Sequence, residues 1–197
     1  MTTFRSGNGA AWLDLLSTRE GRYRTADRHR DRISSAAALG EWLAANGLAP
    51  ARAVGAADVE RFAQVREALH RVAVAVVGGA GARAGVAAVG AGDVRVIGDA
   101  LAADSGLRVA RGADGLLVRR PATAQEALAR LTRAAVEDLT GPRRAQLRAC
   151  GDDTCAGIFF DPTGRRRWCT DQSCGNRLRV RAHRARVTDG EGVGGSV

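Results

Sequence analysis

All four cysteines of this 197-residue chain lie between positions 150 and 174. They form two pairs, Cys150–Cys155 and Cys169–Cys174, and four residues separate the members of each pair. A complete set of four thiols in one short segment favours a single tetrahedral site, which suits zinc or an iron–sulfur centre. The intervening residues 156–168 are long enough for one β-hairpin. This spacing therefore predicts a small metal module near the C-terminus.

Other uses of these cysteines fit the sequence less well. Residues 1–10 contain no apolar leader, so we expect a cytoplasmic, reducing location in which disulfides are rare. A catalytic zinc keeps an open position and commonly has histidine or carboxylate ligands, but His29, His70 and His183 do not lie at ligand spacing. His183 could replace one cysteine, and redox or iron–sulfur chemistry and unrelated buried cysteines stay open as alternatives. The predicted ligands of a structural Zn²⁺ are Cys150, Cys155, Cys169 and Cys174.

Positive charge is concentrated in the same part of the chain. The formal net charge is +9, and all 30 basic residues are arginines. Residues 143–187 contain eleven arginines and four aspartates, a net charge of +7. A GC-rich coding sequence explains part of the use of arginine instead of lysine. The clustering of the arginines, and not their choice over lysine, therefore indicates nucleic-acid binding. A basic segment beside a metal module is typical of nucleic-acid-binding zinc proteins.

The arginines that follow Cys174 are spaced for a helix that contacts phosphates. On a helix Arg177, Arg181 and Arg184 share one face, and Arg179 and Arg186 share the other. Such a helix could lie in the major groove with phosphates on both sides. We expect about half of the basic candidates to be solvated charges instead. The candidate nucleic-acid-binding residues are Arg165, Arg166, Arg167, Arg177, Arg179, Arg181, Arg184 and Arg186.

The sequence Cys-Gly-Asn-Arg at residues 174–177 is the signature of the CGNR zinc-finger family, which residues 147–186 resemble. Members of that family usually carry an N-terminal stress-induced transcription regulator domain. Residues 12–19 look like the opening motif of that domain, although Ser17 stands where asparagine is common. The turn between Asp161 and Arg165 is shorter than in most relatives. The resemblance implies a bacterial transcription regulator of the stress response, with an N-terminal domain that binds a small-molecule effector or forms a homodimer.

Hydrophobic periodicity and turn residues predict the remaining elements. We expect helices at residues 36–46, at 59–77 after a cap at Asp58, and from a cap at Thr123 to residue 139. A hairpin is expected at 107–119, with Asp-Gly at its turn, and a second one pairs 158–160 with 165–168. The remaining segments are predicted to be an exposed loop at 19–32, a flexible connection at 78–92 and a disordered tail from 190.

These elements predict an α+β fold that is mostly α. A helical N-terminal domain with one antiparallel β-hairpin, residues 1–142, precedes a four-cysteine zinc module of hairpin and helix, residues 143–188, and a tail, residues 189–197. No apolar run approaches the ~18 residues of a membrane span, and no catalytic constellation is evident, so we expect neither a membrane protein nor an enzyme. The predicted function is zinc-dependent binding of duplex DNA in transcription regulation. The alternative is an RNA- or protein-interaction module with a purely structural zinc, which salt-sensitive preference for DNA over RNA would distinguish.

Overall fold

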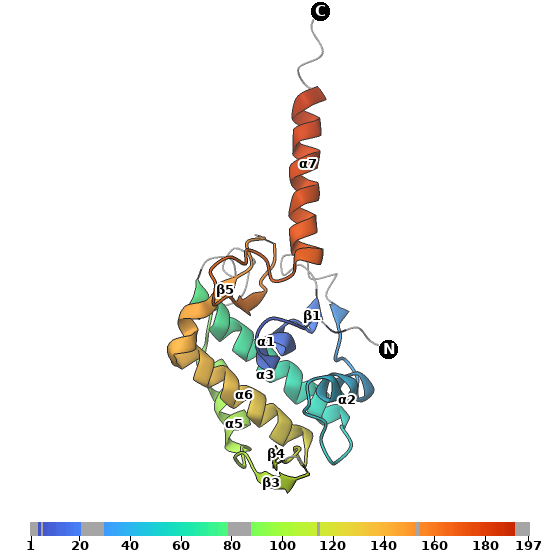
Figure 1. The fold of residues 1–197 in the computed structure, drawn as a ribbon, viewed down its shortest axis with the longest axis vertical. Coiled ribbons are helices and arrows are strands. Elements are labelled where there is room, and N and C mark those ends of the chain that lie inside the picture. The colour runs from blue at the N-terminus through green and yellow to red at the C-terminus, as the bar shows by residue number, and fades with distance from the viewer. Residues whose placement is uncertain are drawn as a thin grey trace, which may run out of the picture.

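The computed structural model describes residues 4, 6–20, 30–78, 88–113, 115–152 and 154–191. Helices α3, α5 and α6 pack on one another, and helix α7 projects away from this body (Figure 1). The helices are α1 (Ala11–Leu16), α2 (Ala36–Ala45), α3 (Ala56–Val77), α5 (Ala91–Ala102), α6 (Ala124–Thr140) and α7 (Asn176–Glu191). The strands are β1 (Arg19–Glu20), β2 (Arg30–Asp31), β3 (Val109–Gly112), β4 (Gly115–Val118), β5 (Leu147–Ala149) and β6 (Ile158–Phe160). The mostly α architecture with small antiparallel pairs confirms the predicted fold class.

The main core forms where α1, α2, α3 and α6 bury their apolar faces. Trp12 and Leu13 from α1 are fully buried, as is Trp42 from α2. In α3 the buried Phe62 and Leu69 repeat at helical spacing, as predicted. No helix in the described part of the chain is long and apolar enough to span a membrane.

Two helix starts were predicted correctly and one was wrong. The hydroxyls of Ser35 and Thr123 cap α2 and α6 by accepting from backbone N–H groups three residues later, at 3.2 Å in each case. Asp58 does not precede α3. It lies in the first turn, and its carboxylate accepts from the backbone N–H of Gly55 at 2.9 Å. An acidic side chain at the third helical position can satisfy the N-cap N–H in this way, so the helix begins earlier than predicted.

Part of the expected connection at 78–92 is helical. Residues 79–87 lie outside the described residues, but α5 begins at Ala91, after an N-cap at Gly90. The carboxylate of Asp93 accepts from the N–H of Gly90 at 2.9 Å and also pairs with Arg71 of α3 at 2.5 Å. Helix α5 was not predicted from the sequence.

Short strands and an ion pair form at the two ends of the segment 19–32, which was expected to be an exposed loop. Residues 21–29 lie outside the described part, but β1 and β2 pair across them. Arg66 of α3 is almost fully buried and donates to both carboxylate oxygens of Asp31, at 2.9 and 2.7 Å, and to the hydroxyl of Thr18 at 2.9 Å. The prediction of a wholly exposed loop was therefore wrong at both of its ends.

The predicted hairpin at 107–119 is confirmed. Strands β3 and β4 pair antiparallel, with Val109 opposite Val118 and Gly112 opposite Gly115. This hairpin lies at the end of the molecule opposite α7 (Figure 1). All four residues of β4 are exposed.

The strand pairing predicted inside the metal module was wrong. Strand β6 pairs with β5, which precedes the first cysteine, and residues 165–168 form no strand. A turn does form at residues 162–164, where the carboxylate of Asp161 accepts from the N–H groups of Thr163 and Arg166, at 3.1 and 2.8 Å. The backbone N–H of Arg166 is thereby used within the turn.

Strand β6 joins two cores, because successive side chains of a strand point to opposite faces. Ile158 and Phe160 pack in the main core together with Leu147 of β5, whereas Phe159 packs against the cysteines. The ring of Phe160 meets Trp12 edge to face, with centroids 6.4 Å apart. The metal module is therefore part of the same packed body as the N-terminal helices.

Buried polar bonds reinforce this junction. The indole N–H of Trp12 donates to Asp138 of α6 at 2.7 Å, and the second carboxylate oxygen of Asp138 accepts from Arg143 at 2.7 Å. On α3, Nε2 of the buried His70 donates to the carbonyl of Ala156 at 2.9 Å. Burial lowers the pKa of His70 and so favours the neutral imidazole, which makes this bond when its proton is on Nε2. Residues far apart in the sequence thus hold the module in one orientation.

Candidate metal centre and basic helix

The four cysteine sulfurs converge on one point. Their Sγ atoms all lie within 4.8 Å of one another, and none is in a disulfide. The Sγ atom of Cys169 is 3.7 Å from that of Cys155 and 3.5 Å from that of Cys174. Zinc–sulfur bonds of about 2.3 Å in a tetrahedron require sulfurs about 3.8 Å apart. The donor set and its dimensions therefore fit Zn²⁺ with a closed coordination shell.

Nearby donors favour the thiolate form of Cys150 and Cys174, whereas the contacts among the sulfurs raise the pKa of Cys155 and Cys169. The sulfur of Cys174 accepts from Nη2 of Arg177 at 3.0 Å, and that of Cys155 accepts from the N–H of Gly157 at 3.3 Å. Hydrogen bonds from the neighbouring cysteines, followed by the charge of Arg177, hold the pKa of Cys174 well below its usual range. Hydrogen bonds from Cys155 and Cys169 lower the pKa of Cys150 to about 7. When bound, Zn²⁺ supplies a structural cross-link between the two cysteine pairs.

Gly157 allows the two cysteine pairs to approach each other. A Cβ atom at this position would lie 2.9 Å from the sulfur of Cys169 and 3.2 Å from that of Cys155. Contacts this short leave no room for a larger side chain without displacing a metal ligand.

Aromatic side chains cover the sulfurs. Phe159 is fully buried against the cysteines, and the partly buried Trp168 packs beside them. The guanidinium of Arg166 stacks over Phe159 at 4.4 Å from its centroid. This cover limits the access of water to the metal ligands.

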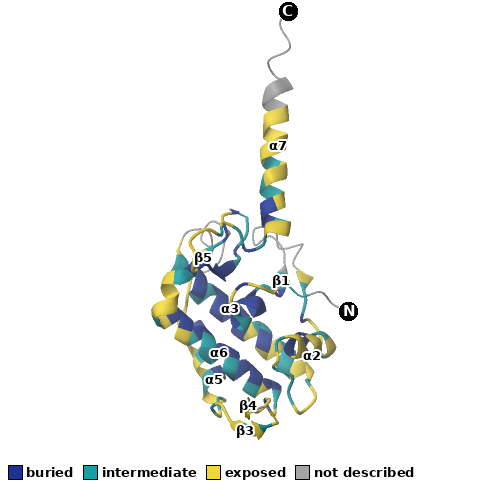
Figure 2. Ribbon diagram, viewed as in Figure 1, coloured by how far each residue is buried: buried dark blue, intermediate teal, exposed yellow. Residues whose placement is uncertain are grey.

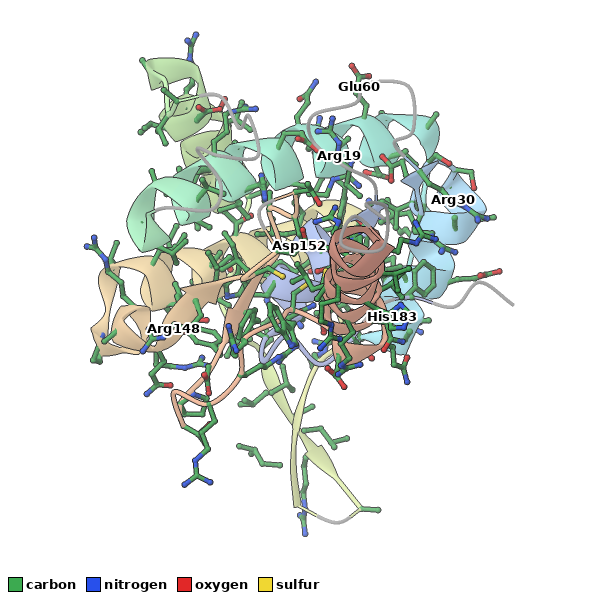
Figure 3. All side chains as sticks on the ribbon, turned by 90° about the horizontal axis from the view of Figure 1, so that it is seen from above. Arg19, Arg30, Glu60, Arg148, Asp152 and His183 are labelled. Atoms are coloured by element: carbon green, nitrogen blue, oxygen red, sulfur yellow. The ribbon has the colours of Figure 1, made fainter. Side chains whose placement is uncertain are left out.

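Helix α7 is anchored to the module through Asp152. The side chain of Asp152 has no exposed surface, and its carboxylate accepts from Arg177 at 2.6 Å and from Arg181 at 3.3 Å. Burial alone would raise the pKa of Asp152, but hydrogen bonds from Thr154 and Arg177 bring this pKa below its ordinary value. Figure 3 looks down on α7 and shows Asp152 beside the helix. The first two turns of α7 are thus fixed relative to the metal centre.

Three of the predicted nucleic-acid-binding arginines are partly buried and use their guanidinium groups within the protein. Arg177 and Arg181 bind Asp152, as described above. Arg166 donates from Nε to the carbonyl of Trp168 at 2.9 Å, from Nη1 to that of Gly7 at 2.9 Å, and from Nη2 to that of Cys169. Arg166 therefore connects the module to the N-terminal segment.

The other predicted arginines lie at the surface. Arg179 has a side chain 60% exposed and pairs with Asp171, which is 70% exposed, at 2.5 Å, an arrangement that is weakly stabilising. The guanidinium of Arg167 lies 5.0 Å from the ring centroid of Trp168. Arg165, Arg184 and Arg186 are exposed, the last two on the outer part of α7 (Figure 2).

Sequence reasoning missed Asp152, Arg166 and Gly157 as residues that build the site. Asp152 lies between Cys150 and Cys155, and its negative charge can neutralise arginines on α7. That local signal could have identified it. The role of Arg166 had no such signal, because the carbonyl groups it binds come together only in the folded chain.

A closed four-thiolate site that carries an exposed, arginine-rich helix defines a zinc-finger protein. Residues 9–142 match the model of the ABATE family, described as a putative stress-induced transcription regulator. Residues 146–187 match that of the CGNR zinc finger. Because the first match spans more than half of the chain, the chain belongs to the ABATE family, and it carries a CGNR zinc finger that binds zinc. A comparison with curated proteins gave no match.

Proposed function

We propose that this protein is a DNA-binding transcription regulator whose zinc centre holds α7 in position for the major groove. The observation that carries this proposal is the anchored and protruding basic helix. Arg177 and Arg181 fix its base to Asp152, and the side chains at 182–187 are exposed. Its 16 residues correspond to about 24 Å of helix, enough to follow the groove for several base pairs.

The contacts that we propose go mainly to phosphates. Arg179 and Arg186 lie on the side of α7 that faces away from Asp152, and Arg184 lies on the other side beyond the anchor. Arg165 and Arg167 add positive charge at the exposed turn of the module. The surface pair of Arg179 with Asp171 is weak enough to be exchanged for a phosphate. We leave Arg166 out of the proposed contacts because the protein uses its donors.

The remaining parts of the proposal follow from this role. A single basic helix reads few base pairs, so we propose that the protein acts as a homodimer on two half-sites. The family description supports a role in the response to stress. We propose a binding protein and not an enzyme, located in the cytoplasm, where free thiols persist.

The test is the binding of zinc-loaded protein to duplex DNA across a salt series. If about six phosphates are contacted, the slope of log K against log salt should be about −5. Replacing Arg179 and Arg186 with glutamine should make this slope shallower by about two, without loss of zinc. The matched control is Arg52→Gln, an exposed arginine in the N-terminal part. Equal salt slopes for the Arg179/Arg186 variant and the Arg52→Gln control, or a preference of the protein for RNA over DNA, would contradict the proposal.

A further inference from the structure

Four arginines line a hollow at the end of the body opposite α7. The hollow has a volume of about 460 Å³ and lies where the β3–β4 hairpin meets the start of α6. This volume is within the usual range of small-molecule sites. Figure 1 shows the hairpin and α7 at opposite ends of the longest axis. The arginines are Arg108, Arg119, Arg120 and Arg130.

Hydrogen bonds fix the backbone around the hollow. The N–H of Arg119 donates to the carbonyl of Arg108 at 2.7 Å, and Nη1 of Arg130 donates to the carbonyl of Arg119 at 2.9 Å. The carboxylate of Glu126 accepts from the N–H of Ala122 at 2.7 Å. The guanidinium groups therefore extend from backbone positions held by both the hairpin and α6.

Positive charge in this hollow is largely uncompensated. Within the described residues, Arg108, Arg119 and Arg120 form no ion pair, and Glu126 is the single acidic residue in the lining. Four positive charges against one negative charge repel one another, and a bound anion would relieve that repulsion. One guanidinium group can donate two parallel hydrogen bonds to two oxygens of the same phosphate.

We propose that this hollow binds a small ligand that carries two or more linked phosphate groups. Four arginines line one hollow of about 460 Å³, a volume that suits a small oligophosphate better than a nucleic-acid backbone. The lining contains no aromatic residue on which a base could stack, so recognition rests on the phosphates. The site is separate from α7 and does not depend on the proposed binding of DNA.

The test is a calorimetric titration of the zinc-loaded, full-length protein with inorganic triphosphate near physiological salt. Because oligophosphates also bind divalent cations, the zinc content is measured after each titration. Replacing both Arg108 and Arg120 with glutamine should weaken binding by at least tenfold, roughly the loss of charge-assisted hydrogen bonds. The matched control is Arg111→Gln, an exposed arginine of the same hairpin that does not line the hollow.

A second comparison separates the hollow from the basic helix. Replacing Arg179 and Arg186 of α7 with glutamine should leave triphosphate affinity unchanged, and an excess of duplex DNA should not displace the triphosphate. The proposal fails if the wild-type protein does not bind triphosphate at millimolar concentration, or if the Arg108/Arg120 variant binds as tightly as the control. Loss of affinity in the α7 variant would assign the binding to that helix and overturn the proposal as well.

Discussion

Phe160 and Phe159 are adjacent on β6 but serve different cores, which makes them a matched pair of probes. Phe160 is almost fully buried in the main core, with its ring edge to face against Trp12 and under the guanidinium of Arg143 at 4.1 Å. Phe159 is fully buried against the cysteines. Replacing each of them with alanine therefore tests whether the zinc module and the N-terminal helices fold as one unit.

We expect Phe160→Ala to lower the free energy of unfolding by about 4 kcal/mol, since a buried phenylalanine truncated to alanine costs roughly 3–5 kcal/mol. The aromatic contact with Trp12 contributes about 1 kcal/mol of this loss. For a chain of this length the midpoint should fall by about 12 °C. Far-UV circular dichroism should show a single transition that includes the N-terminal helices. The variant should still hold one zinc per chain at low temperature.

Phe159→Ala should instead weaken zinc retention, by about tenfold or more in a competition with chelator, because it opens the cover over the sulfurs. Added zinc should restore much of its thermal stability by mass action. In Phe160→Ala, which keeps its affinity for zinc, the deficit relative to the wild type at the same zinc concentration should remain. The reasoning would be refuted by a Phe160→Ala protein that melts in two steps and keeps the wild-type midpoint for its helices. That result would mean that the module folds independently of the body.

Two further predictions concern the metal site and an internal ion pair. Gly157→Ala should lose zinc to chelator more readily than Gly98→Ala, because the added Cβ would lie 2.9 Å from the sulfur of Cys169, whereas at Gly98 it meets nothing within 4 Å; equal zinc retention would contradict this. Burial would raise the pKa of Asp31, but hydrogen bonds and charge from Arg66 bring that pKa below its ordinary value. The stability from this pair should therefore be complete above about pH 4 and be lost as the pH falls through the lowered pKa. Urea denaturation should show Asp31→Asn to be less stable than the wild type at pH 7, with the difference shrinking at acidic pH; a difference independent of pH would contradict it.

Local signals predicted much of this structure. The equal spacing of the cysteines identified the four sulfurs that come together in the fold, because the geometry of zinc leaves few alternatives. The capping residue Thr123 predicted the start of α6, and the Asp-Gly sequence predicted the β3–β4 hairpin. Each of these signals acts over a few residues and needs no knowledge of the rest of the chain.

The errors arose where distant segments determine the outcome. Helix α5 was missed because its inward residues, such as Val96 and Ala100, are few and follow a stretch rich in glycine. The partner of β6 was wrong because both flanking segments could pair with it locally, and the choice depends on Leu147 entering the main core. Arg166 was predicted to contact nucleic acid, and its internal role was missed because one of the carbonyls it binds, that of Gly7, is distant in the sequence.

The shared core limits how such a protein can be divided. The ABATE match ends at residue 142 and the CGNR match begins at residue 146. Leu147, Ile158 and Phe160 belong to the CGNR match, but they pack in the core of the N-terminal helices. A finger exchanged between relatives at this point would carry these three side chains away from the surface to which they are fitted. We therefore expect the finger and its N-terminal partner to be inherited together, with changes at Trp12 compensated at Phe160, and not to be shuffled as independent cassettes.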